Sequence, residues 1–104
     1  MKLDLLVMTV HPDDAELGAG GTIAKYVAEG KNVGIIDLTR GELGTRGTAE
    51  TRANEAATAA AILGVAVREN LELRDGFFQN NEESQLCIIQ AIRKYQPEIV
   101  ITNA

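Results

Sequence analysis

The segment at residues 11–14, His-Pro-Asp-Asp, combines the only histidine of the 104-residue chain with two adjacent carboxylates. A neutral imidazole and a carboxylate three residues further along can bind one divalent cation, as His11 and Asp14 would. The carboxylate between them, Asp13, would remain free to accept a proton from a water molecule. One short segment could therefore supply two metal ligands and a general base.

The same residue types are also common in ordinary loops, where an aspartate can simply cap the helix that follows. The position of the segment favours chemistry over capping. Residues 3–10 form a nearly unbroken apolar run, which is typical of a parallel strand buried on both faces. Ligands of open parallel sheets bind beyond the carboxyl ends of such strands, and residues 11–14 lie at that end.

Strand-like and helix-like segments alternate along the chain. The expected strands are residues 3–10, 32–39, 65–73 and 98–102, and the expected helices are residues 19–29, 49–63 and 81–95. In the third helix, Leu86, Ile89 and Ile92 recur at helical spacing, and Pro97 ends the helix. This alternation predicts right-handed crossovers and a mostly parallel sheet, so the expected fold class is α/β, a Rossmann-like three-layer sandwich. We expect residues 1–104 to form one domain, truncated after the fourth strand.

Charged residues concentrate in the loops that follow the first three expected strands. The loop at residues 40–47 carries three glycines, two arginines and Glu42, and the loop after the third strand carries Asp75. These loops share one edge of a parallel sheet, so we expect a polar cleft there. Arg52, on the second helix, could form a surface ion pair with Glu55 or could reach back under the metal site.

A formal net charge of −5 without a basic stripe argues against a nucleic-acid-binding surface and favours small-molecule partners. The one cysteine, Cys87, cannot form an internal disulfide, and its apolar neighbours predict a buried helical side chain. The apolar run at the amino terminus is too short for a secretory signal or a membrane span. We therefore expect a cytoplasmic protein that neither binds nucleic acid nor enters a membrane.

Three stretches together resemble the zinc-dependent N-acetylglucosaminyl deacetylases of the LmbE-like, or PIG-L, family: residues 11–14, residues 38–42 (Leu-Thr-Arg-Gly-Glu) and residues 51–55 (Thr-Arg-Ala-Asn-Glu). The resemblance covers essentially the whole chain in the right order. Its closer likeness is to bacterial members that deacetylate an N-acetylglucosaminyl malate on the route to bacillithiol. The resemblance implies the N-terminal part of a single deacetylase domain, a Zn²⁺ cofactor, an acetylated amino-sugar substrate and, for the intact protein, a homo-oligomer.

The resemblance also assigns roles to individual residues. It makes His11 and Asp14 zinc ligands and Asp13 the general base, in agreement with the chemistry of the residues themselves. Glu42 and Arg52 match positions that line the substrate side of the family's cleft. The reaction implied for the intact enzyme is metal-assisted hydrolysis of the acetyl amide, which releases acetate and a free amine.

The chain departs from the family pattern at the third zinc ligand. In the family this ligand is a histidine from a later His-Pro-Asp-His-like segment, and no histidine follows His11 here. Catalytic zinc normally has three protein ligands. We therefore expect the 104-residue chain alone to bind zinc weakly and to hydrolyse little.

Two other classes of function stay open at this point. An acidic pair after the first strand, Asp75 after the third and Thr102 at the fourth are also features of a phosphoryl-accepting signalling domain that binds Mg²⁺. His11 at the centre of the cluster favours a borderline metal such as zinc over magnesium. The chain could also be a folding fragment with an exposed sheet edge and no activity.

Overall fold

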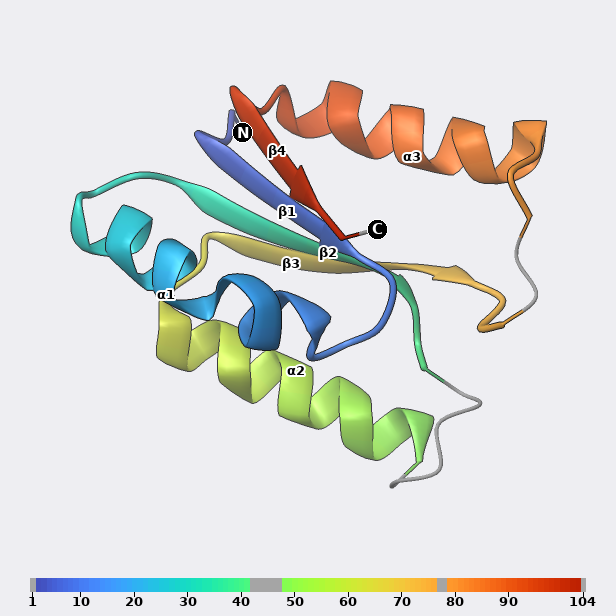
Figure 1. Cartoon of the computed structure of the whole chain (residues 1–104), viewed down its shortest axis with the longest axis horizontal. Coiled ribbons are helices and arrows are strands. Elements are labelled where there is room, and N and C mark those ends of the chain that lie inside the picture. Colours follow the sequence, from blue (N-terminus) through green and yellow to red (C-terminus); the bar gives the residue numbers. More distant parts are fainter. Residues whose placement is uncertain (1, 42–47, 77–78, 104) are drawn as a thin grey trace.

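Residues 2–41, 48–76 and 79–103 are described by the computed structural model, which confirms the expected α/β class (Figure 1). Strands and helices alternate along these residues. Their order is β1 (Leu5–Thr9), α1 (Asp14–Ala28), β2 (Val33–Thr39), α2 (Ala49–Leu63), β3 (Val67–Leu73), α3 (Glu82–Tyr95) and β4 (Ile99–Thr102).

Within the described ranges, the strands form one sheet in the order β3-β2-β1-β4, and every neighbouring pair is parallel. Val7 of β1 pairs with Ile35 of β2, and Met8 pairs with Thr102 of β4. The chain moves outward from β1 to β3 and then returns to the other side of β1. The carboxyl ends of β1 and β4 therefore flank the point where the strand order reverses, which is where open α/β sheets bind ligands.

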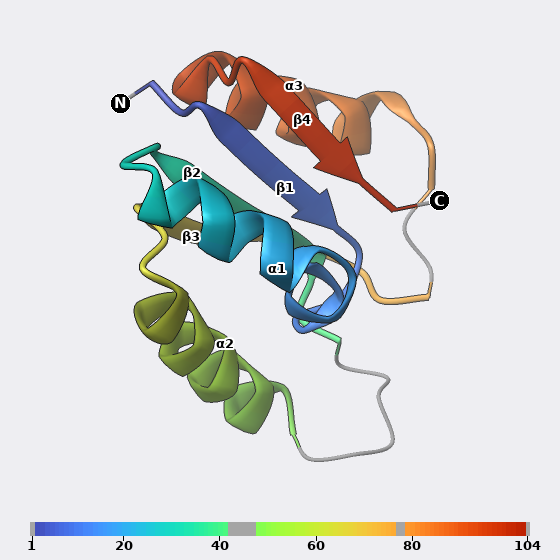
Figure 2. The ribbon, with the colours of Figure 1, turned by 60° about the vertical axis from the view of Figure 1, so that its left-hand side comes forward.

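Helices cover both faces of the sheet, as a three-layer sandwich requires. α1 and α2 lie on one face and α3 lies on the other (Figure 1, Figure 2). Successive residues of β1 face opposite cores. Val7 belongs to the apolar cluster that includes Ile23 of α1, and Met8 belongs to the cluster that includes Tyr95 of α3. The continuous burial of β1 explains its unbroken apolar run.

Helix α1 begins at Asp14 rather than at residue 19, so the expected start of this helix was wrong. The glycines at residues 18, 20 and 21 are helical, although each costs about 1 kcal/mol relative to alanine in a helix interior. Segment 11–14 therefore runs directly into the first turn of α1. Asp14 and Glu16 lie in that turn, where the helix dipole favours negative charge.

The apolar stripe of α3 does not face the sheet. Its exposed members are Leu86, Ile89 and Ile92, with exposed fractions of 49%, 40% and 36%. The helix instead buries Ser84, Ala91 and Tyr95, and Tyr95 donates its hydroxyl hydrogen bond to Glu69 of β3. Cys87 is half-buried rather than buried as expected. Helical spacing predicted the helix but not its orientation.

None of the helices in the described ranges is long and apolar enough to cross a membrane.

Candidate metal centre

His11 and Asp14 lie in a compact turn between β1 and α1. The backbone N–H of His11 donates to Asp14 Oδ2 at 3.0 Å, and the backbone N–H of Asp14 donates to the carbonyl of His11 at 3.1 Å. This turn brings His11 Nδ1 to 3.6 Å from Asp14 Oδ2. The structure thus brings together the two side chains that were predicted to bind the metal.

Asp14 also contacts the end of the neighbouring strand. The side-chain amide of Asn103, just beyond β4, donates to Asp14 Oδ2 at 3.3 Å. This contact is possible because β4 pairs directly with β1 in parallel register. Asp14 is therefore held from two sides, and the contacts lie at the point where the strand order reverses.

The imidazole of His11 has a second carboxylate partner that was not assigned to the site from the sequence. His11 Nε2 lies 2.7 Å from Oδ1 of Asp75, a buried residue in the loop after β3. The signal available in the sequence was the place of Asp75 in a loop at the same sheet edge. Spacing along the chain could not place it, because 64 residues separate the two positions.

Asp13 has an unusual backbone conformation and does not cap α1. Its φ of 104° lies in the left-handed region, and its side chain makes no capping hydrogen bond. Such a conformation in a residue other than glycine costs about 1–3 kcal/mol, and aspartate adopts it more readily than most residues. The Asp13 side chain is 54% exposed, so its carboxylate is open to solvent. The capping interpretation of this residue is therefore wrong.

Arg52 reaches back from α2 toward the candidate site. Its Nη1 donates to the carbonyl of Gly41 at 3.1 Å, and its Nη2 lies 3.7 Å from Asp13 Oδ2. Gly41 has a φ of 66°, and a Cβ atom there would lie 2.5 Å from Arg52 Nη1, so a side chain at this position would displace the guanidinium. Of the two alternatives for Arg52, the structure supports the one under the metal site. The other predicted substrate residue, Glu42, lies outside the described residues.

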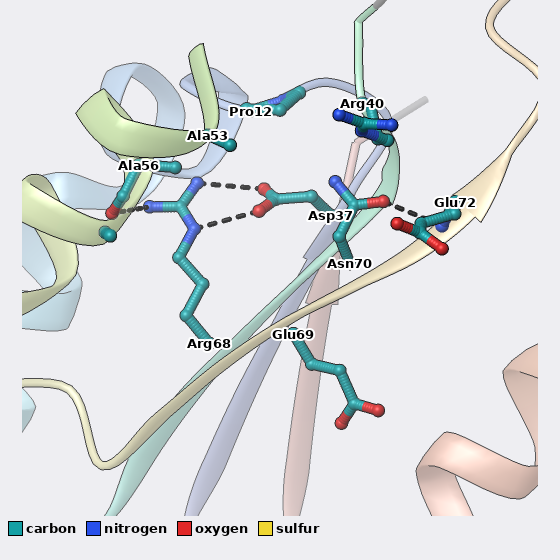
Figure 3. Close-up of a pocket in the computed structure, with 10 residues that line it drawn as sticks. Pro12, Asp37, Arg40, Ala53, Ala56, Arg68, Glu69, Asn70 and Glu72 are labelled. Carbon is teal, nitrogen blue, oxygen red and sulfur yellow. Dashed lines mark hydrogen bonds and ion pairs between the residues drawn. The ribbon is translucent and has the colours of Figure 1, made fainter. Parts of the chain in front are cut away.

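A second group of charges lies on the α2 side of the sheet and is buried. The guanidinium of Arg68 donates from Nε and Nη2 to the two carboxylate oxygens of Asp37, at 2.8 Å and 2.9 Å, as Figure 3 shows. Its Nη1 donates to the carbonyl of Ala56 at 3.3 Å. Glu16 Oε1 lies 3.0 Å from Arg68 Nη2 without hydrogen-bond geometry, so that contact is a charge–charge interaction. We call Arg68, Asp37 and Glu16 the buried ion cluster.

Burial raises the pKa of Asp37 above its ordinary value, and the carboxylates of Glu16 and Asp14 act in the same direction. The hydrogen bonds and charge of Arg68 oppose this shift but do not cancel it. Burial alone would lower the pKa of Arg68, but its hydrogen bonds to Asp37 and its contact with Glu16 raise that pKa above the ordinary value. Arg68 therefore stays charged within the cluster.

A cavity of about 380 Å³ adjoins the buried ion cluster. Alanines of α2 and Pro12 line one side, and polar residues of β2 and β3 line the other (Figure 3). Among the lining residues, the side chain of Asn70 is engaged at both ends, because Nδ2 donates to the carbonyl of Thr39 and Oδ1 accepts the backbone N–H of Glu72. The cavity touches segment 11–14 only through Pro12.

The donor set at residues 11–14 fits part of a zinc site. Imidazole nitrogen and carboxylate oxygen are both zinc ligands, and two ligands of one tetrahedral zinc ion lie about 3.3 Å apart. The 3.6 Å between His11 Nδ1 and Asp14 Oδ2 is close to that separation. In the ranges that the structure covers, however, no three His, Cys, Asp or Glu side chains are grouped so that they could hold one metal ion.

Comparison with known proteins agrees with this architecture. Residues 6–104 match the family described as PIG-L, GlcNAc-PI de-N-acetylase. A diacetylchitobiose deacetylase from Thermococcus kodakarensis is 35% identical over 104 aligned residues, which cover 93% of this chain and 39% of the relative.

Two solved structures are similar as well. A conserved protein from Thermus thermophilus is 51% identical with a TM-score of 0.89, over 94% of this chain and 44% of the other. A 4-carboxy-2-hydroxymuconate hydratase from Pseudomonas putida is 29% identical with a TM-score of 0.80, over 96% of this chain and 46% of the other. The chain thus spans less than half the length of each of these three proteins. The family match over nearly all of its residues nevertheless shows that the chain belongs to the PIG-L, or GlcNAc-PI de-N-acetylase, family.

Proposed function

We propose that this chain is part of a zinc-dependent hydrolase that removes the acetyl group from an N-acetylglucosaminyl compound. The observation that carries the proposal is the turn that sets His11 and Asp14 side by side at the strand-order reversal, with Asp13 between them in the sequence. Membership of a de-N-acetylase family and the likeness to a diacetylchitobiose deacetylase support an acetylated amino sugar as the substrate.

His11 Nδ1 and a carboxylate oxygen of Asp14 are the groups that would hold the zinc ion. Zinc, when bound, would supply an activated water and would polarise the carbonyl of the acetyl amide. Asp14 is prepared for this role by the backbone N–H of His11 and the amide of Asn103, which orient its carboxylate. Such outer partners fix the direction of metal ligands and are a regular part of metal sites.

Asp13 would act as the general base. Its carboxylate is open to solvent and would take one proton from the attacking water as the new C–O bond forms. The same carboxyl group would return that proton to the departing nitrogen as the C–N bond breaks, so that the products are acetate and a free amine. Arg52, 3.7 Å from Asp13, would keep this carboxylate near the reaction centre and, with Glu42, would contact the substrate.

We further propose N-acetylglucosaminyl malate as the specific substrate and a cytoplasmic homo-oligomer as the working form. Family membership does not favour the alternative of a magnesium-binding signalling domain. The chain is also similar to a hydratase, and hydration of a carbon–carbon double bond is likewise a reaction of water. The test below therefore includes a substrate of that kind.

The test is an acetate-release assay on the longest polypeptide that contains this chain. N-acetylglucosaminyl malate and diacetylchitobiose would be supplied with zinc, after removal of metal by a chelator, and with a hydroxymuconate as the control substrate. We expect acetate release that chelation abolishes and zinc restores, and none from Asp14→Ala. Turnover of the hydroxymuconate without acetate release from either sugar would contradict the proposal.

A further inference from the structure

We propose that Asp75 is a positioning residue for the metal centre, and that it holds His11 so that Nδ1, not Nε2, is the nitrogen that faces the cation. This inference rests on the proposed function, because it takes His11 and Asp14 as the metal-binding pair. It goes beyond that function by giving a role to a residue outside segment 11–14.

The contact places Nε2, rather than Nδ1, against a carboxylate group. Asp75 Oδ1 lies 2.7 Å from His11 Nε2, and an ionised carboxylate can only accept hydrogen bonds. If Nε2–H donates to this carboxylate, the lone pair of the neutral imidazole is on Nδ1. Nδ1 is also the nitrogen on the side of Asp14, at 3.6 Å from Oδ2.

The contrast in burial between the two partners supports an orienting role. Asp75 is buried, whereas the ring of His11 is partly open to solvent. A carboxylate is costly to bury unless it is hydrogen-bonded, and the imidazole of His11 is one of the partners of Asp75. A buried, fixed acceptor behind an accessible ring holds that ring in one orientation and increases the basicity of the outward nitrogen.

The fold brings Asp75 to this place through an irregularity in β3. Residues 37 and 39 of β2 pair with residues 70 and 73 of β3, so the longer stretch of β3 bulges. Asn70 Oδ1 accepts the backbone N–H of Glu72, which has a left-handed φ of 57°. The loop that follows the bulge then places Asp75 against His11.

Asp75 could instead be a metal ligand itself, and the distances argue against that role. Two ligands of one tetrahedral zinc ion lie about 3.3 Å apart, whereas Asp75 Oδ1 and His11 Nε2 are separated by a hydrogen-bond distance of 2.7 Å. Coordination through Asp75 would require the imidazole to turn away from its present hydrogen bond.

The test measures zinc affinity and the state of the imidazole on the same purified chain. Zinc dissociation constants would be determined by competition with a fluorescent chelator for the wild type, Asp75→Ala and Asp75→Asn. The matched control is Asp4→Asn, the same substitution at the opposite edge of the sheet, where Asp4 accepts the backbone N–H of Asn32. His11 is the only histidine, so ¹⁵N–¹H correlation spectra of the ring report on it alone. Far-UV circular dichroism would verify the fold of each variant, and the isosteric Asp75→Asn protects the test against misfolding of Asp75→Ala.

We expect Asp75→Ala to weaken zinc binding by about 10-fold to 100-fold. Asp75→Asn should weaken it less, because an amide oxygen still accepts from Nε2–H. Asp4→Asn should leave it unchanged, because Asp4 lies at the opposite edge of the sheet. The wild-type spectrum should show Nε2 protonated and Nδ1 shifted by zinc. Equal zinc affinity in wild type and Asp75→Ala, or zinc on Nε2 with Nδ1 protonated, would overturn the inference.

The outcome also separates this inference from the proposed function. Asp75-dependent zinc binding without acetate release from any amino sugar would overturn the proposed function alone. Acetate release with zinc affinity independent of Asp75 would overturn the inference alone. Binding by two protein ligands alone is expected to be weak, so the absence of zinc binding is judged in excess zinc: His11 ring signals that do not respond to it would overturn the inference as well as the metal pair on which it rests.

Discussion

The turn at residues 11–14 and the buried ion cluster use similar residue types in opposite ways. At the turn, His11 and Asp14 have side chains that are 40% and 28% exposed, and at the cluster Arg68 and Asp37 are 8% and 3% exposed. All three guanidinium nitrogens of Arg68 have protein partners, so the cluster has little capacity for a ligand. At the turn, by contrast, the side chains of His11 and Asp14 remain partly accessible to solvent. The difference shows that accessibility, rather than charge, distinguishes the candidate site from the structural ion pair in this protein.

The largest expected effect comes from Asp13→Asn, in the solvent-accessible turn at residues 11–14. The substitution removes the general base, so we expect kcat for acetate release to fall by about 10²-fold to 10⁴-fold in the intact enzyme. Zinc affinity should be unchanged, because Asp13 is not one of the two proposed ligands. Thermal melting should also be unchanged, because the side chain is largely exposed. Normal turnover by this variant would eliminate Asp13 as the base.

Arg68→Ala should have its effect on stability instead. It leaves the buried carboxylate of Asp37 without its partner, which costs about 3–5 kcal/mol of unfolding free energy. Urea unfolding monitored by circular dichroism would measure the loss. The matched control is the double variant Arg68→Met with Asp37→Leu, which removes both charges and should recover much of the stability. If the double variant is as unstable as Arg68→Ala, the cost is not that of an unpaired charge.

The raised pKa of Asp37 predicts that the stability of the protein depends on pH. A carboxyl group whose pKa is higher in the folded state binds protons more tightly there, so its contribution to unfolding free energy is greatest below the ordinary value of 3.8. That contribution falls as pH rises from 3.8 through the folded pKa. Asp37→Asn lacks it, so the stability of the wild type relative to this variant should decrease over that range. A difference that increases with pH in urea titrations would show a lowered pKa.

The smallest expected effect on stability is that of Glu16→Gln. This variant also tests most directly whether the turn and the buried ion cluster are separate regions. Glu16 follows segment 11–14 in the sequence, yet its carboxylate contacts Arg68. We expect a loss of about 1 kcal/mol in unfolding free energy, because an amide keeps the shape of the side chain but not the charge. Zinc affinity should be unchanged. If Glu16→Gln weakened zinc binding as strongly as Asp14→Ala, Glu16 would belong with residues 11–14. The distinction between that turn and the buried ion cluster would then be lost.

Much of the fold could be predicted from local patterns. Helix α2 was expected at residues 49–63 and is found at Ala49–Leu63, and the order of strands and helices agrees throughout the described ranges. The start of α1 was wrong because a glycine-rich stretch predicts a loop, whereas the packing of Ala15 and Ile23 against the sheet stabilises a helix there. The exposed stripe of α3 shows a further limit, since periodicity identifies a helix without identifying the element that covers it.

The roles of His11, Asp13 and Asp14 stay predictions, but the sequence by itself determined that they lie together. They are at most three positions apart in the chain, and a helix begins at Asp14, so they must lie close together. The contacts of His11 with Asp75 and of Arg52 with Asp13 were decided only by the tertiary structure. They join segments 64 and 39 positions apart, and they depend on strand order, on the bulge in β3 and on the left-handed backbone at Gly41. Covalent geometry fixes local neighbours, whereas distant ones are fixed by how the strands and helices pack.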